Sequence, residues 1–156
     1  MIIDGYNLIG IQHGNLEKER EMLINSLVEY RRRKGHAITI VFDGWKSGEA
    51  TESRSVIGGV TVIYSRIGEK ADSVIKRIVS SEKREWIVVT SDRDIADHAW
   101  SVGSIPIPSE AFLGAIQRKA SYTSDEEEEC REYSRRGNPR QLSKKDKSIQ
   151  RALSKL

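Results

Sequence analysis

Short apolar runs alternate along the chain with longer segments in which apolar residues recur at helical spacing. The short runs predict strands at 1–9, 36–44, 60–65, 85–91 and 104–108. The amphipathic segments predict helices at 16–35, 69–83, 92–103 and 109–120. Residues 37–42 and 86–90 are apolar almost throughout, which is typical of strands buried on both faces. The pattern therefore predicts an α/β domain of three layers, α/β/α, with a central, mostly parallel sheet.

Glycine and polar residues refine the boundaries of these elements. Gly35 and Gly103 are suited to end their helices, and Ser109 is suited to cap the helix that begins there. Segment 45–59 is polar and rich in Gly and Ser, so we expect a loop.

The last part of the chain differs in composition from the rest. We expect a domain over 1–120 and a charged C-terminal extension over 121–156. The extension contains the acidic run DEEEE (125–129), and 131–156 then holds nine Lys or Arg against two Asp or Glu, a net charge of +7. Residues 143–156 fit a helix with apolar residues on one side. Such a basic segment suits a polyanionic partner, although a merely solvated tail would have the same composition.

The composition argues against several classes of protein. No segment approaches the run of about 20 apolar residues that a membrane span needs. The start MIID lacks the basic and apolar regions of a signal peptide, so we expect none. Cys130 is the lone cysteine, which leaves no partner for an internal disulfide or a cysteine-rich zinc site. These features predict a cytoplasmic protein.

Acidic residues follow the predicted strands at the points where the strands end. They are Asp4, Asp43, Asp72 and Asp92, with Asp94 and Asp97 directly behind the last. Because the carboxyl ends of parallel strands meet at one rim of a sheet, we expect these acids to lie together. Each acid alone also has a simpler explanation as a turn former before glycine, a partner of a helix dipole or a helix cap.

A cluster of carboxylates at one rim predicts a divalent cation. Clustered acids raise each other's pKa unless a cation neutralises them. Mg²⁺ and Mn²⁺ prefer oxygen ligands, often carboxylates together with water and phosphate. Such a site can lower the pKa of a bound water and stabilise the charge of a phosphoryl transition state. The chemistry predicted is metal-assisted hydrolysis of a phosphodiester.

Polar neighbours of the acids fit the same interpretation. Asn7 is suited to orient Asp4 or a metal-bound water. Thr90 and Ser91 could hydrogen-bond a carboxylate or the phosphate. Asp94 lies nearer to the strand end than Asp97 does, so it is better placed to reach the metal.

Four motifs carry a resemblance to a known family. In order, they are IIDGYNLIG, VFDG, EKADSVI and VVTSDRDIADHA. Together they resemble the NYN domains of the PIN-like nuclease superfamily, and most closely the bacterial YacP-like NYN group. The likeness covers nearly the whole chain and extends to its basic end, RRGNPRQLSKKDKSIQRALSKL. The resemblance implies a PIN-like α/β/α fold and a divalent-metal endoribonuclease, and some members of the group cut mRNA on the translating ribosome.

The resemblance also implies roles for particular residues. Asp4, Asp72 and Asp92 match the acidic metal-site positions of the family, and Asn7 matches its accompanying asparagine. Asp94 matches a less regular position. The resemblance leaves open whether Asp43, the Asp of VFDG, has a structural or a catalytic role. The implied cofactor is Mg²⁺ or Mn²⁺, and the implied partners are RNA and the ribosome.

An RNA substrate requires cationic side chains near the acids. The candidates are Arg31, Arg32, Arg54, Arg66, Arg135, Arg136, Arg140, Lys144 and Lys145. Arg31 and Arg32 end a predicted helix, where cations also interact favourably with the helix dipole. Trp45, in the predicted loop, either stacks on a base or packs against the sheet.

Two other functions are compatible with the sequence. One is a noncatalytic RNA- or ribosome-binding module that uses the same basic residues. The other is a structure-specific DNA nuclease, since PIN-like folds also serve flap nucleases, but the chain lacks the long helical insertions expected there. Asp4→Asn distinguishes a catalytic site from a binding module, because only a catalytic site loses its function with that carboxylate.

Overall fold

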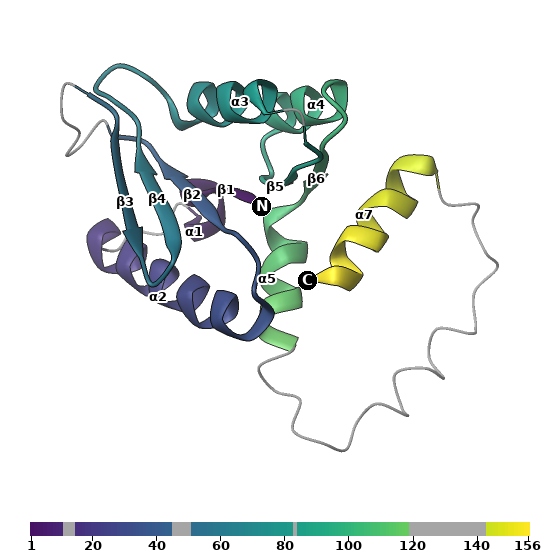
Figure 1. Cartoon of the computed structure of the whole chain (residues 1–156), viewed down its shortest axis with the longest axis horizontal. Coiled ribbons are helices and arrows are strands. Elements are labelled where there is room, and N and C mark those ends of the chain that lie inside the picture. The colour runs from purple at the N-terminus through teal and green to yellow at the C-terminus, as the bar shows by residue number, and fades with distance from the viewer. Residues whose placement is uncertain (11–14, 45–50, 83, 119–142) are drawn as a thin grey trace.

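A six-stranded sheet forms the middle layer of the structure (Figure 1). This is a computed structural model, and it describes residues 1–10, 15–44, 51–82, 84–118 and 143–156. The strands are β1 (Ile2–Asp4), β2 (Thr39–Phe42), β3 (Ser53–Ile57), β4 (Val60–Tyr64), β5 (Ile87–Val89) and β6 (Ile105–Ile107). Their order is β3-β4-β2-β1-β5-β6, and all neighbours pair in parallel except β3 and β4.

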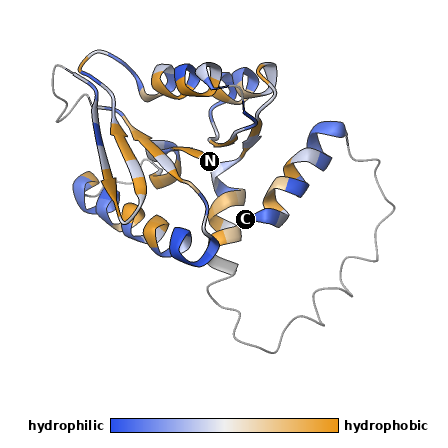
Figure 2. Ribbon diagram, viewed as in Figure 1, coloured by the Kyte–Doolittle hydropathy of each residue, from blue (hydrophilic) through white to orange (hydrophobic). Residues whose placement is uncertain are grey.

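Helices cover both faces of the sheet, which confirms the predicted three-layer α/β/α fold. The helices are α1 (Gly5–Ile9), α2 (Leu16–Lys34), α3 (Ala71–Ser81), α4 (Arg93–Ser101), α5 (Ser109–Arg118) and α7 (Lys144–Lys155). Alternate residues of each strand point to opposite faces. Ile3 therefore joins the cluster that Leu27 of α2 enters, whereas Ile2 joins the cluster of Val74 in α3. Figure 2 shows the apolar sides of the helices turned toward the sheet.

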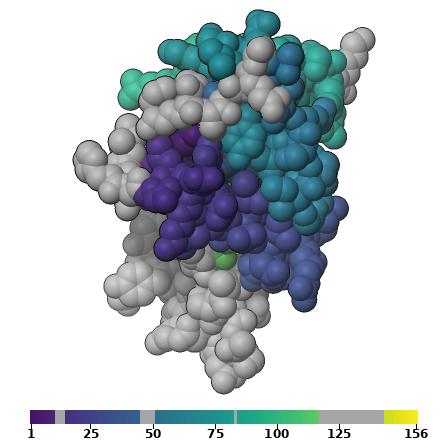
Figure 3. Space-filling view, turned by 90° about the vertical axis from the view of Figure 1, so that its left-hand side faces the viewer, coloured from purple at the N-terminus to yellow at the C-terminus, as the bar shows by residue number. Residues whose placement is uncertain are grey.

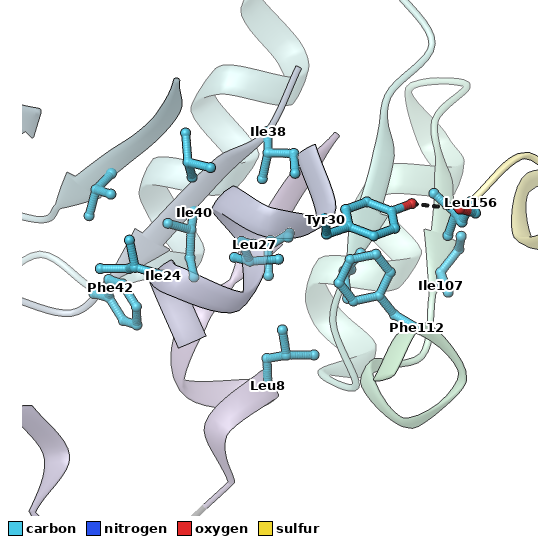
Figure 4. Close-up of a cluster of buried hydrophobic side chains, with 14 of the residues drawn as sticks. Leu8, Ile24, Leu27, Tyr30, Ile38, Ile40, Phe42, Ile107, Phe112 and Leu156 are labelled. Atoms are coloured by element: carbon cyan, nitrogen blue, oxygen red, sulfur yellow. Dashed lines mark hydrogen bonds between the residues drawn. The ribbon is translucent and has the colours of Figure 1, made fainter. Parts of the chain in front are cut away.

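The first predicted strand ends earlier than its apolar residues indicate. We expected a strand over 1–9, but β1 stops at Asp4 and residues 5–9 form helix α1. The Asp4 side chain starts this helix, since it accepts a hydrogen bond from the backbone amide of Asn7. Leu8 still reaches the core, but from a helix (Figure 4).

The prediction of a loop over 45–59 is wrong for its second half. Ser53–Ile57 form β3, which pairs antiparallel with β4 at the edge of the sheet. Gly58 and Gly59 make the turn, with φ of 54° and 85°. The side chains of β3 are largely exposed, so they lack the apolar pattern by which strands are recognised. Residues 45–50 lie outside the described residues.

The expected cap of α5 is also corrected. Ser109 is the first residue of the helix, not the residue before it. The Pro108 carbonyl accepts the first helical hydrogen bond, from the Phe112 amide at 3.1 Å. The backbone amide of Ser109 donates to Ser91 Oγ at 3.2 Å, and this bond ties α5 to the end of β5.

The predicted C-terminal helix is present and packs on the body of the protein. Helix α7 lies against β6 and α5 (Figure 1), and Ser143 and Asp146 form a capping box at its start. Leu156 is fully buried, and its carbonyl accepts a hydrogen bond of 2.9 Å from Tyr30 Oη (Figure 4). The division into 1–120 and 121–156 stays a prediction. No helix in the described parts of the chain has both the length and the apolar character to cross a lipid bilayer.

Candidate active site

Asp4 lies at the carboxyl end of the central strand β1 and is 5% exposed. Three donors hold its carboxylate. Asn7 donates from Nδ2 to Oδ2 at 2.9 Å and from its backbone amide to Oδ1 at 3.2 Å, and Thr90 Oγ1 donates to Oδ2 at 3.3 Å. Burial raises the pKa of Asp4, and the Asn7 hydrogen bonds oppose that rise because they favour the ionised form. Asn7 and Thr90 are thus the hydrogen-bond partners of this carboxylate, and their roles in a reaction stay predictions.

The glycine that follows Asp4 is required by packing. A Cβ atom on Gly5 would lie 2.2 Å from Cε1 of the Phe42 ring, far inside van der Waals contact. Phe42 in turn packs between Tyr6 and Tyr64, with ring centroids 5.5 Å apart in each pair. The Asp-Gly pair therefore marks the place where α1 crosses directly over the end of β2, and the glycine lies inside a helix, not in a turn.

Helix α3 begins beside Asp43, which follows β2. Asp43 Oδ1 accepts a hydrogen bond from the backbone amide of Ala71, while the cap residue Lys70 makes no side-chain hydrogen bond to the helix. Asp43 therefore supplies the cap of α3 from another segment of the chain. This contact fixes the helix end that carries Asp72, so Asp43 has a defined structural role.

Asp72 is surrounded by other carboxylates. Partial burial raises its pKa first, and the negative charges of Asp92 and Asp43 raise it further. The charge of Asp72 likewise contributes to the raised pKa of Asp4. The acids at the ends of β1, β2 and β5 and at the start of α3 thus lie near enough for their charges to act on one another, on the side of the sheet where the parallel strands end.

Asp92 starts helix α4. Its Oδ1 accepts hydrogen bonds from the backbone amides of Asp94 at 2.8 Å and Ile95 at 3.2 Å. The backbone amide of Asp92 donates to Thr90 Oγ1 at 3.1 Å. Because that same hydroxyl donates to Asp4, Thr90 links two of the acids predicted to hold a metal.

Asp94 is turned toward another partner. It forms an ion pair with Lys76 of α3, and this cation lowers the pKa of Asp94. Its side chain is exposed, and so is Asp97 one turn later. The structure therefore places Asp94 as a bridge between α4 and α3, and a catalytic role for it stays a prediction.

The donor set fits a hard divalent cation only in part. Among the described residues, no three His, Cys, Asp or Glu side chains form a group that could hold a metal ion. The side chains of Asp4, Asp72 and Asp92 nevertheless offer carboxylate oxygens, the ligand type that Mg²⁺ and Mn²⁺ prefer, and these cations usually complete their shell with water. The ligand chemistry of these side chains therefore suits such a cation, but their arrangement does not by itself form a three-ligand site.

Cationic residues also lie near this rim. Arg54 is exposed on β3 opposite Ile63, close to the carboxyl end of β4, and Arg66 follows β4 with its Nε 3.2 Å from Glu69. Lys70 lies closer still, since its charge lowers the pKa of Asp72. We did not single out Lys70 from the sequence, although its place directly before Ala71-Asp72 was a usable signal.

Other predicted RNA contacts lie elsewhere. Arg31 and Arg32 are at the C-terminal end of α2, near the amino ends of the strands, so the structure does not bring them to the acids. Arg31 packs under the β3–β4 turn, where a Cβ on Gly59 would lie 2.4 Å from its guanidinium carbon. Lys144 and Lys145 are on α7. Arg135, Arg136, Arg140 and Trp45 lie outside the described residues.

A contact between an arginine and an aromatic ring joins α2 to the end of β4. Residues of α1, α2 and the β3–β4 pair lie next to one another on the face shown in Figure 3. The guanidinium of Arg20 lies 5.6 Å from the centroid of the Tyr64 ring. Arg20 lowers the pKa of Tyr64, but burial has the larger effect and raises it. This contact ties α2 to the sheet.

Comparison with known proteins agrees with this geometry. The profile of the YacP-like NYN domain matches residues 1–156. The chain is 27% identical over 88 residues to a Bacillus subtilis (strain 168) protein named uncharacterized protein YacP, and the match covers 52% of this chain and 51% of that protein. The chain thus aligns with about half the length of this relative.

Two solved structures share the fold. The crystal structure of Rae1 (YacP) from Bacillus subtilis has a TM-score of 0.61 and 24% identity, covering 76% of this chain and 75% of that one. The W164L mutant of the same protein has a TM-score of 0.60 and 23% identity, covering 75% and 74%. These similarities show a common fold, and the profile match over the entire length shows the family. The chain belongs to the YacP-like NYN domain family.

Proposed function

We propose that this chain is a divalent-metal-dependent endoribonuclease that hydrolyses RNA phosphodiester bonds, with mRNA on the translating ribosome as its substrate. The observation that carries this proposal is the surroundings of Asp4. Its carboxylate is buried, held by Asn7 and Thr90, and close enough to Asp72 for the Asp72 charge to raise its pKa. Carboxylates whose pKa values are raised by burial and by neighbouring negative charges are typical of functional sites. Membership of the YacP-like NYN family supports the choice of RNA.

The residues of the site have separate roles in this proposal. Asp4, Asp72 and Asp92 would hold Mg²⁺ or Mn²⁺, which would supply positive charge to the phosphate group and lower the pKa of water bound there. Asn7 favours the ionised form of Asp4 and fixes the direction of its Oδ2 atom. Thr90 fixes the position of Asp4 relative to the start of α4, because its hydroxyl donates to Asp4 and accepts from the amide of Asp92.

The surroundings of the acids favour a phosphodiester substrate. Helices α3 and α4 both begin at this rim, and the N-terminal end of a helix favours negative charge. Lys70, Arg54 and Arg66 are exposed at the same side of the sheet and would contact neighbouring phosphates of the strand.

The test compares the wild-type chain with Asp4→Asn in a reconstituted bacterial translation system that contains Mg²⁺ or Mn²⁺. A translated reporter mRNA and the same mRNA without ribosomes are incubated in parallel. We expect discrete cuts by the wild type, and a rate at least about a hundredfold lower for Asp4→Asn, as for the loss of one preorganised electrostatic group. Asp97→Asn is the matched control, because Asp97 is exposed on α4 and outside the cluster.

Each outcome of this test is informative. Cuts only in the translated mRNA would support the ribosome as the place of action, and cuts in both samples would support an enzyme that acts on free RNA. Equal products from the wild type and Asp4→Asn would contradict the assignment of the site. Ribosome binding without cuts by any variant would favour the noncatalytic binding module.

A further inference from the structure

A cavity of about 400 Å³ lies between α7 and the amino ends of β5 and β6. Its lining includes Trp100 near the end of α4, Ile87 and Ile105 at the first positions of the strands, and Arg151 on α7. The acids of the candidate active site follow the carboxyl ends of the strands, so this cavity is at the opposite end of the sheet. Its volume lies within the range usual for small-ligand sites.

We propose that this cavity binds one nucleotide of a single-stranded RNA, with the base against Trp100 and the phosphate on Arg151 and Lys155. This inference rests on the proposed function in one respect, which is that RNA is taken to be the nucleic acid that this chain binds.

The apolar part of the cavity suits a base. Trp100 is half-buried, and Ile87 and Ile105 lie in the same lining. The ring of Trp100 already attracts a cation, since Lys145 Nζ lies 5.4 Å from its centroid. Stacking of bases on aromatic rings is the usual way in which proteins hold single-stranded RNA.

The polar part of the cavity suits a phosphate. Arg151 and Lys155 are spaced by one turn on α7, so their side chains lie on one face of that helix. Neither takes part in any ion pair found within the described residues, so both charges are available to a ligand. Lys144 and Lys145 at the start of helix α7 add further positive charge on this side of the protein, which favours a polyanion.

One acid in the lining determines the orientation that we expect for a bound nucleotide. Glu85 is exposed at the cavity and, among the described residues, has no cationic partner. A carboxylate repels a phosphate but accepts hydrogen bonds from the amino and imino groups of a base. A bound nucleotide would therefore direct its base edge toward Glu85 and its phosphate toward Arg151.

The experiment measures binding in the full-length Asp4→Asn chain, which leaves the RNA uncut. A labelled single-stranded oligonucleotide RNA is titrated at several salt concentrations, and binding is read from its anisotropy. Contact with Trp100 is read from the change in tryptophan fluorescence that is lost in Trp100→Phe. We expect Trp100→Ala to weaken binding about fivefold to a hundredfold, the range seen when a stacking aromatic is removed. Trp100→Phe, which keeps an aromatic face, should retain most of the affinity.

Charge variants on α7 provide the second readout. Arg151→Gln should weaken binding and reduce the slope of log affinity against log salt by about 1, as for the loss of one phosphate contact. Lys147→Gln is the matched control, since Lys147 lies on the same helix outside the cavity lining, and it should change affinity less than twofold. Circular dichroism confirms that each variant is folded, and the exposed Arg151 keeps the test valid if Trp100→Ala unfolds.

The proposal is overturned if folded Trp100→Ala and Arg151→Gln chains both bind within twofold of their parent. It is also overturned in its RNA form if adenosine or uridine monophosphate binds as tightly as the oligonucleotide, since the site would then serve a free nucleotide. Its failure is separable from that of the proposed function. If Asp4→Asn loses cleavage while Trp100→Ala binds RNA unchanged, the nuclease proposal stands and the cavity site is overturned. If binding depends on Trp100 but the wild type never cuts RNA, the cavity site stands and the nuclease proposal is overturned.

Discussion

Asp43 Oδ1 accepts a hydrogen bond from the backbone amide of Ala71, and so the loop after β2 caps the helix that carries Asp72. Substitution tests this contact. We expect Asp43→Ala to lower the free energy of unfolding by about 0.5–2 kcal/mol, the usual cost of losing an N-terminal cap. Asp43→Asn keeps an acceptor oxygen and should cost less. Urea unfolding measures both, and equal losses would contradict a capping role.

The raised pKa of Asp72 has a consequence for stability. An acid whose pKa is higher in the folded state than in the unfolded state contributes stability below its unfolded pKa, and that contribution is lost as the pH rises through the folded value. Without divalent cations, Asp72→Asn should therefore be more stable than the wild type at pH 7, by about 1 kcal/mol or less because the group is only partly buried.

The same difference should shrink as the pH is lowered, because the wild-type carboxyl then takes up a proton. Denaturant unfolding at several pH values measures it. A difference that is independent of pH would show that Asp72 acts through packing and that the charges of its neighbours have no part.

A bound cation should stabilise the folded chain. At a concentration ten times the dissociation constant, Mg²⁺ or Mn²⁺ should add about 1.4 kcal/mol to the free energy of unfolding of the wild type. Asp97→Asn should respond equally, because its side chain lies away from the carboxylate cluster. Asp4→Asn should respond little. Thermal unfolding with and without the cation measures this, and an undiminished response of Asp4→Asn would place the cation elsewhere.

Gly5 and Phe42 should show strong energetic coupling. Gly5→Ala places a methyl group against the Phe42 ring and should cost about 1–3 kcal/mol through overpacking. Phe42→Leu removes ring atoms from that space, so the double variant should lose less stability than the sum of the two single variants. A double-mutant cycle measures the coupling. Additive losses would show that the added methyl group is accommodated by another route.

The end of α7 should contribute to the stability of the whole body. Leu156→Ala should lower the free energy of unfolding by about 2–4 kcal/mol, because Leu156 is fully buried next to Tyr30 and Phe112. Ser154→Ala, at an exposed position of the same helix, should change it by less than about 0.5 kcal/mol. Equal, small effects of the two substitutions in urea unfolding would show that α7 does not pack as described.

The sequence predicts the parts of the fold that bury apolar residues. The central strands and the long helices have clear patterns, and the acids at their ends lie on the same side of the sheet because parallel strands share a rim. Edge strand β3 is missed because both of its faces are mostly exposed and its first three residues are polar, so that no apolar run marks it. Helix α1 is missed because a segment of five residues that includes Leu and Ile fits a strand as well as a helix. The hydrogen bond from the Asn7 amide to Asp4, which starts the helix, is visible only in the structure.

Long-range contacts limit what the sequence predicts about the candidate site. The pairing of Asp94 with Lys76 depends on how α4 packs beside α3, and residue spacing contains no sign of it. The same holds for Arg31, which looks like a free cation at a helix end but packs under the β3–β4 turn. The cavity beside Trp100 exists only because α7 returns to the edge of β6.

The four acids at the rim come from segments that are far apart in the chain, from residue 4 to residue 92. Pairing such distant segments into a parallel sheet is a late and slow event in folding. The bond from Thr90 to Asp4 joins β5 to β1, and the bond from Asp43 to Ala71 joins the loop after β2 to α3. A chain that is only partly folded therefore has scattered aspartates and no site, which confines any nuclease activity to molecules that have completed their sheet.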